Sequence, residues 1–155
     1  MKKIQFTIDI KAPAQEVYEK MLGLGHIETY QQWTAAFNPT STYEGNWEKG
    51  SKMYFVGTDE SGKRGGMVSE IAENTPNKFV SICHRGILDG ENEIVEGPMV
   101  EQWAGGLENY SFQEHEGTTR VMIECDVMED EKMQEYFNST WPKALKKLKE
   151  IIEHS

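Results

Sequence analysis

The chain has 155 residues, a length that suits one compact domain, and 37% of them are hydrophobic, which is enough to build a core. Its 16 basic and 26 acidic residues give a net charge of −10, which disfavours nucleic acid and anionic lipid surfaces as partners. The longest apolar run, Met53–Val56, is far too short to span a membrane. We therefore expect a single domain, residues 1–155, that is cytoplasmic and has no membrane span and no nucleic-acid partner.

Apolar and polar residues alternate from Ile4 to Ile10, a period of two that predicts a strand with one buried face. Pro13 suits the first turn of a helix that ends at Gly23, and a second short helix is predicted from Ile27 to Phe37. The middle of the chain has the alternation and turn residues of antiparallel strands. These six predicted strands are Thr42–Gly45, Lys52–Thr58, Gly65–Ala72, Lys78–Leu88, Leu107–His115 and Thr119–Met128.

The last segment, Glu131 to His154, is predicted to be a long helix, because apolar residues recur every three or four positions from Met133 to Ile152. Pro142 interrupts this pattern and predicts a kink, or a break with a restart near Thr140. The expected fold is α+β: a curved antiparallel sheet of about seven strands wraps around the long C-terminal helix, and the two short N-terminal helices close one end.

Seven short segments, in this order along the chain, carry a family resemblance. They are Lys11–Val17, Trp33, Gly45–Ser51, Gly66–Ile71, Trp103–Tyr110, Gly117–Val121 and Trp141–Leu148. In these segments the chain resembles the START/SRPBCC superfamily, whose helix-grip fold is that of the birch-pollen allergen. Within the superfamily it is similar to the family named for the activator of the heat-shock-protein ATPase. The resemblance implies a cavity between sheet and helix that other members use for lipids, sterols, hormones and polyketides, and it carries over no catalytic motif.

Aromatic residues are spread over the helices and strands that would surround such a cavity. One interpretation is that they only fill the core, which is the usual role of an aromatic stripe. The other is that they line an apolar binding pocket, and the eight methionines would help its wall adapt to a ligand. The candidate ligand-binding aromatic residues are Trp33, Phe37, Phe55, Trp103, Tyr110, Phe137 and Trp141.

His84 and Arg85 are adjacent in the predicted strand Lys78–Leu88, so one of them must point inward. The inward residue is either paired with an acid such as Glu70, as a structural element, or anchors a ligand. An inward Arg85 would bind a carboxylate, and an inward His84 would hydrogen-bond a carbonyl group. Glu70, His84 and Arg85 complete the candidate ligand-binding residues.

The pattern predicts no catalytic residue, no metal site and no cofactor. Cys83 and Cys125 lie within strand-like runs and are expected to be small buried hydrophobic residues. The acidic stretch Asp89–Glu96 lacks the glycine and the terminal acid of a calcium loop. It is expected to form a mobile loop over the cavity mouth, with Gly86, Gly90 and Gly97 as hinges.

Three functions remain open at this level. The first is a small-molecule binding module for a hydrophobic or amphipathic ligand. The second is a protein-interaction or co-chaperone-like module that uses the lysine-rich face of the last helix for a protein partner. The third is a cyclase- or hydrolase-type enzyme that uses His84, Arg85 and Glu70 in the same cavity.

Overall fold

A computed structural model, which describes residues 1–154, contains eight strands and four helices within that range. Their bounds agree closely with the sequence-based expectations, and β6 and α3 are additional. The elements are β1 (Lys2–Ile10), α1 (Ala14–Leu22), α2 (Ile27–Thr34), β2 (Thr42–Gly45), β3 (Lys52–Thr58), β4 (Arg64–Thr75), β5 (Phe79–Asp89), β6 (Asn92–Ile94), α3 (Pro98–Glu101), β7 (Leu107–His115), β8 (Thr118–Val127) and α4 (Glu131–Glu153).

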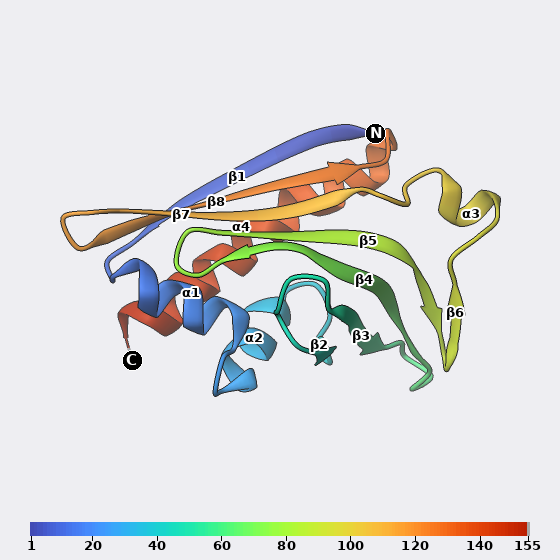
Figure 1. Ribbon diagram of the computed structural model, residues 1–155, viewed down its shortest axis with the longest axis horizontal. Coiled ribbons are helices and arrows are strands. Elements are labelled where there is room, and N and C mark those ends of the chain that lie inside the picture. Colours follow the sequence, from blue (N-terminus) through green and yellow to red (C-terminus); the bar gives the residue numbers. More distant parts are fainter. Residues whose placement is uncertain (155) are drawn as a thin grey trace.

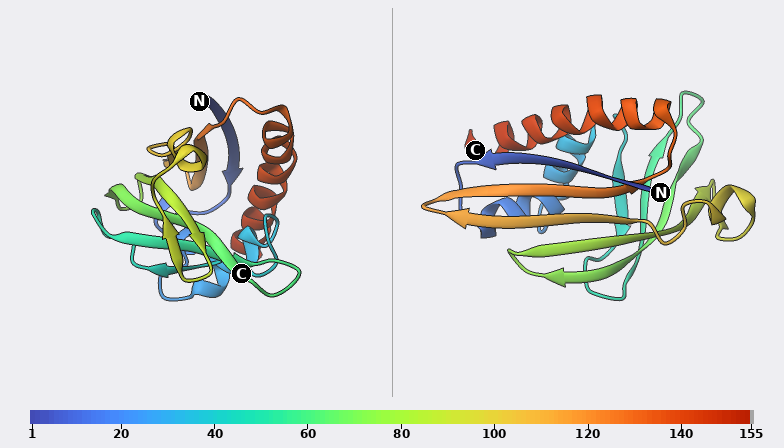
Figure 2. Two further views of the ribbon diagram at one scale, coloured as in Figure 1. Left: turned by 90° about the vertical axis from the view of Figure 1, so that its right-hand side faces the viewer. Right: turned by 90° about the horizontal axis from the view of Figure 1, so that it is seen from above.

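The strands form one curved sheet in the order β1-β8-β7-β5-β4-β3-β2, with β6 added to β5, and all pairings are antiparallel. Helix α4 runs along one side of the sheet and packs on β1 and α2, while α1 and α2 close one end (Figures 1 and 2). This arrangement confirms the predicted α+β helix-grip fold.

The alternation in the first and last strands of the chain, β1 and β8, sets the inner face. In β8, Val121, Ile123, Cys125 and Val127 are all buried, and the residues between them are partly exposed. Strand β1 pairs with β8 over its whole length and adds Ile4, Phe6 and Ile8 to the core. Cys83 and Cys125 are both buried and not disulfide-bonded, as their positions predicted.

Asp130 is the N-cap of helix α4, and its side chain accepts hydrogen bonds from the backbone N–H groups of Lys132 and Met133. The helix is continuous through Pro142, so the predicted break near Thr140 does not occur. Proline removes the hydrogen bond to the carbonyl of Asn138, but Pro142 and Asn138 are both exposed, and water can serve that carbonyl.

The acidic stretch is not the loop that was expected. Asn92–Ile94 forms β6, which pairs with β5 through a tight turn at Gly90, whose φ of 63° favours glycine. Gly86 lies within β5 rather than at a hinge. A Cβ at this position would be 2.4 Å from the carbonyl oxygen of Ile94. Close approach of β6 therefore requires the glycine.

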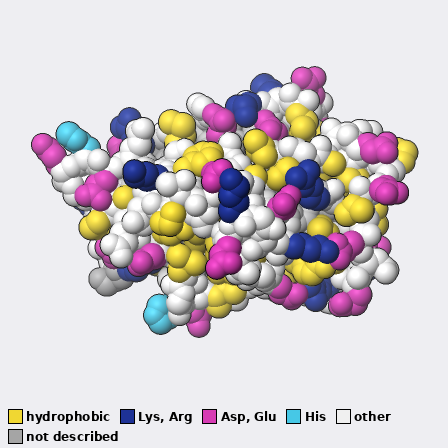
Figure 3. Space-filling model, viewed as in Figure 1, with side chains coloured by type: hydrophobic (Ala, Val, Ile, Leu, Met, Phe, Trp, Pro, Cys, Tyr) yellow, Lys and Arg dark blue, Asp and Glu magenta, His cyan; other side chains and the backbone are white. Residues whose placement is uncertain are grey.

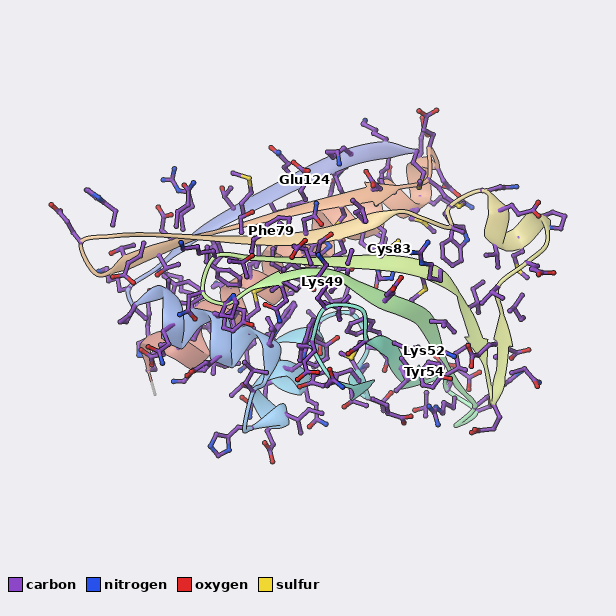
Figure 4. All side chains as sticks on the ribbon, in the orientation of Figure 1. Lys49, Lys52, Tyr54, Phe79, Cys83 and Glu124 are labelled. Atoms are coloured by element: carbon purple, nitrogen blue, oxygen red, sulfur yellow. The ribbon has the colours of Figure 1, made fainter. Side chains whose placement is uncertain are left out.

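An acidic residue of β6 also holds this strand in place. Glu93 accepts hydrogen bonds from Lys52 and Tyr54 of β3, with Lys52 Nζ 2.6 Å from Glu93 Oε1 and Tyr54 Oη 2.6 Å from Glu93 Oε2. Lys52 and Tyr54 occupy alternate positions of β3 and are labelled close together in Figure 4, and both reach Glu93. Glu93 thus has structural partners.

Candidate functional site

A pocket of about 670 Å³ lies between the inner face of the sheet and helices α2 and α4. Residues of β3, β4, β5, β7 and β8 form one wall, α2 and α4 form the other, and the α3 segment contributes at one end. This volume falls within the range of small-molecule binding sites.

Eight of the ten candidate residues line this pocket. They are Trp33, Phe37, Phe55, His84, Trp103, Tyr110, Phe137 and Trp141. Glu70 and Arg85 do not line it. They face the outer surface and pair with each other, with Arg85 Nη2 2.9 Å from Glu70 Oε2 and side chains that are 41% and 53% exposed respectively.

The outer surface offers such pairs in several places. On the face shown in Figure 3, basic side chains lie next to acidic ones. Lys63 of the β3–β4 turn pairs with Asp89 in the same way, at 2.6 Å. Arg85 is therefore one of several solvent-facing paired cations, and its inward alternative as a carboxylate anchor is not realised.

A β-bulge at Arg85 decides which side chains of β5 reach the pocket. Ser69 of β4 pairs with His84, and Met67 pairs with Ile87, so three residues of β4 lie opposite four of β5. His84 and Ile87 consequently both line the pocket although they are three positions apart. Simple alternation would have placed Ile87 on the outer face.

His84 is held from both sides. Its Nδ1 lies 2.8 Å from Ser69 Oγ, and its Nε2 lies 3.1 Å from Glu108 Oε1. Tyr110 Oη donates a hydrogen bond to the other carboxylate oxygen of Glu108. A carboxylate can only accept, so His84 Nε2 carries a proton and donates it to Glu108.

Glu108 is therefore the acid that partners the inward residue, in place of the predicted Glu70. The sequence contained a signal for it. Glu108, Tyr110 and Phe112 occupy alternate positions of β7, and Tyr110 and Phe112 are buried, so Glu108 is a charged residue on a buried face. A charged residue on a buried face is usually paired with another polar group or takes part in function.

The row Ser69, His84 and Glu108 contains the residue types of a hydrolase triad, but its geometry does not suit nucleophilic attack. Ser69 is only 1% exposed and is not among the side chains that line the pocket. A nucleophile must reach the substrate. Ser69 is a positioning residue that fixes the orientation of the His84 ring.

Stacked and edge-on aromatic rings form the floor of the pocket. The centroid of Trp33 is 5.8 Å from that of Trp141 and 6.5 Å from that of Tyr110, and Trp141 and Tyr110 are 6.3 Å apart. Trp33 Nε1 donates to the carbonyl oxygen of Met21 at 2.9 Å, which fixes the indole. Tyr30, which the sequence analysis missed, also lines the pocket, 5.6 Å from Trp33. This part of the site is rigid.

Methionines form a softer part of the wall. Met67, Met99, Met128 and Met133 line the pocket, and Met99 and Met133 are 63% and 37% exposed. The exposed pair lies on α3 and at the start of α4, where the pocket meets solvent. Flexible, polarisable methionines at an opening adapt to ligands of different shape.

The electrostatics of the pocket are one-sided. Within residues 1–154 no lysine or arginine lines it, whereas Glu108 and Asp126 do. Burial, reinforced by the charge of Glu108, raises the pKa of the Tyr110 hydroxyl well above its usual value. The same two causes raise the pKa of Tyr30 and of the Cys125 thiol, so all three groups stay neutral at physiological pH.

The described residues contain neither a metal-binding cluster nor a membrane-spanning helix. In the described part of the chain, no three His, Cys, Asp or Glu side chains are grouped so that they could hold a metal ion. No helix among residues 1–154 is long and apolar enough to cross a membrane.

An antiparallel sheet curved around a C-terminal helix, with a pocket between them, defines a helix-grip protein of the START/SRPBCC type, a class of ligand-binding and protein-interaction modules. Residues 11–153 match the family described as "Activator of Hsp90 ATPase homolog 1-like protein", and the chain belongs to this family. Comparison with curated protein sequences finds no match.

Solved structures agree with this assignment of the fold. The solution structure of the Aha1 dimer from Colwellia psychrerythraea is 22% identical, with a TM-score of 0.71 over 99% of this chain and 97% of that one. A solution structure from Cytophaga hutchinsonii is 17% identical, with a TM-score of 0.72 over 99% and 95%. A crystal structure from Mesorhizobium loti is 12% identical, with a TM-score of 0.70 over 99% and 98%. At these identities the similarity establishes the fold alone.

Proposed function

We propose that this protein binds a hydrophobic or amphipathic small molecule in the pocket between the sheet and α4. The observation that carries the proposal is the composition of the wall: it consists mainly of aromatic rings, methionines and other apolar side chains, and it contains the hydrogen-bonded His84–Glu108 pair. Mostly apolar pockets with a few placed polar groups are typical of ligand-binding sites. The apolar wall supplies affinity, and the polar pair sets the ligand's orientation.

The protein-interaction alternative has less support. It predicted a filled core and an exposed apolar patch beside the lysines of the last helix. Lys149, one of those lysines, is engaged with Glu153 at 2.6 Å and with the carbonyl oxygen of Asp9 at 2.7 Å. The exposed apolar side chains of α4, Met133 and Tyr136, lie near its other end. The lysines at positions 143–149 and the exposed apolar side chains are thus separated along the helix.

The enzyme alternative depended on His84, Arg85 and Glu70 acting together. Arg85 and Glu70 lie on the outer surface and His84 faces the pocket, so the three groups do not converge. The buried Ser69 does not replace them as a nucleophile.

The proposal is tested by native mass spectrometry of protein purified gently from its host, followed by extraction of bound molecules. A stoichiometric compound of defined mass supports it. A filled-pocket variant, Cys125→Phe, is expected to lose that compound, because Cys125 is small, 7% exposed and lines the pocket. Met122→Phe, on the other face of the same strand, is the matched control. An apo mass, with no melting shift from a panel of fatty acids, sterols and aromatic acids and amines, would contradict the proposal.

A further inference from the structure

We propose that the pocket selects an amphipathic amine, whose ammonium group binds Glu108 while its hydrocarbon part lies among the aromatic rings. This inference rests on the proposed function and narrows its ligand class. It is carried by three features of the pocket: a carboxylate without a lysine or arginine partner, remaining acceptor capacity on that carboxylate, and aromatic side chains in the surrounding wall.

The first feature is the balance of charge. Of the two acids in the wall, Asp126 already has a cationic partner, since it pairs with Lys3 at 3.2 Å, and it also accepts the backbone N–H of Leu107 at 3.0 Å. Glu108 forms no ion pair with lysine or arginine in the described chain. Its side chain is 23% exposed, so it is poorly hydrated. A partly buried carboxylate without a lysine or arginine partner favours a cationic ligand.

The second feature is geometry. His84 and Tyr110 each donate one hydrogen bond, to different oxygens of Glu108. A carboxylate has about four acceptor positions, so two remain for a ligand. His84 and Tyr110 also fix the carboxylate, because His84 is held by Ser69 and Tyr110 is 2% exposed. The raised pKa of Tyr110 keeps its hydroxyl a donor to Glu108. Glu108 is thus preorganised to accept N–H groups.

The third feature is the aromatic surroundings. Tyr110 lies on the same strand and the same pocket wall as Glu108. The opposite wall contains Tyr30 and Trp33 of α2 and Trp141 of α4. The faces of such rings attract ammonium groups, most strongly when the site is shielded from water. A carboxylic acid would instead place a second negative charge beside Glu108, with no lysine or arginine in the described pocket wall to offset it. An alcohol could donate a hydrogen bond to Glu108 but would gain no charge attraction.

The test uses three ligands with one carbon skeleton: 4-phenylbutylamine, 4-phenylbutanol and 4-phenylbutanoate. Titration calorimetry at neutral pH with the wild-type chain is expected to show the amine binding about tenfold or more tighter than the alcohol, with the acid weakest. Glu108→Gln keeps a carbonyl acceptor and removes the charge, so it should bring amine and alcohol within about threefold. Glu101→Gln removes the same charge from an exposed residue of α3 outside the pocket wall and should preserve the preference.

The outcomes separate this inference from the proposed function. Equal or tighter binding of the alcohol or the acid by the wild type overturns the amine proposal and leaves small-molecule binding intact. No binding of any of the three at about 1 mM, with a folded protein, counts against both. An amine preference that survives in Glu108→Gln overturns the role of Glu108. The wild-type comparison decides the ligand class even if that variant does not fold.

Discussion

His84 of β5 and Glu108 of β7 face each other on the inner surface of the sheet, with His84 Nε2 3.1 Å from Glu108 Oε1. The two residues are 24 positions apart in sequence, and the pairing of Ile82 with Glu108 brings their strands together. Together with Ser69 and Tyr110 they form one hydrogen-bonded row on the largely apolar inner face of the sheet. This row stabilises the fold.

Truncation of Glu108 should therefore destabilise the protein. In Glu108→Ala the buried Tyr110 hydroxyl and His84 lose their shared acceptor, which we expect to cost about 1–3 kcal/mol of unfolding free energy. Glu108→Gln retains one acceptor oxygen and should cost less. Urea unfolding of both variants measures this difference, and equal stabilities for Glu108→Ala and the wild type would contradict it.

Trp141 should be among the residues that contribute most to stability. Its ring contacts Phe37 at 4.9 Å and Trp33 at 5.8 Å between centroids, and its side chain is 3% exposed. We expect Trp141→Ala to cost about 3–5 kcal/mol, because it leaves a large void next to the pocket. Within the described residues the indole N–H has no hydrogen-bond partner, so Trp141→Phe loses only packing. Denaturant unfolding should show a larger loss for Trp141→Ala than for Trp141→Phe, and equal losses would contradict the packing role of the ring.

Arg85→Ala should change little. The Arg85–Glu70 pair is about half exposed on the outer surface, and such pairs contribute about 0–1 kcal/mol. Neither the melting temperature nor the affinity for a pocket ligand should shift appreciably. A large loss of affinity, with stability unchanged, would mean that Arg85 reaches the ligand in solution. Lys63→Ala, which breaks another surface pair, is a suitable control.

Acid should weaken the link between the end of α4 and the segment after β1. Glu153 Oε2 accepts hydrogen bonds from Lys149 Nζ at 2.6 Å and from the backbone N–H of Lys11 at 2.8 Å. These bonds, that of Lys149 first, lower the pKa of Glu153 below its ordinary value. A carboxyl group whose pKa is lower in the folded state stabilises the protein above the unfolded-state pKa, and this stability is lost as the pH falls through the folded-state value.

Glu153→Gln should therefore be less stable than the wild type at neutral pH, and the difference should shrink as the pH falls below about 4. Urea midpoints measured across the acid range give this comparison. Glu150→Gln, an exposed glutamate of the same helix, should not reproduce the effect. A difference between Glu153→Gln and wild type that stays constant with pH would exclude titration of Glu153 as its cause.

Much of the fold follows from local pattern. The period of two in β1 and β8 and the apolar stripe of α4 define strands and helix because burial requires one face of each element to be apolar. The same alternation on β5 shows that one of His84 and Arg85 points inward. For the candidate site, chain pattern and family resemblance together identified most of the aromatic wall.

Other features depend on contacts between distant segments. The bulge at Arg85 places Ile87 in the pocket. It arises from the pairing of β5 with β4, so the alternation of residues within β5 does not predict it. The choice of Glu108 over Glu70 as the partner of His84 depends on which strands are neighbours and which face each acid occupies. Local sequence determines which residues can be buried, and the tertiary structure decides which of them meet, because hydrogen bonds and ion pairs form only between groups that the chain brings within about 3–4 Å.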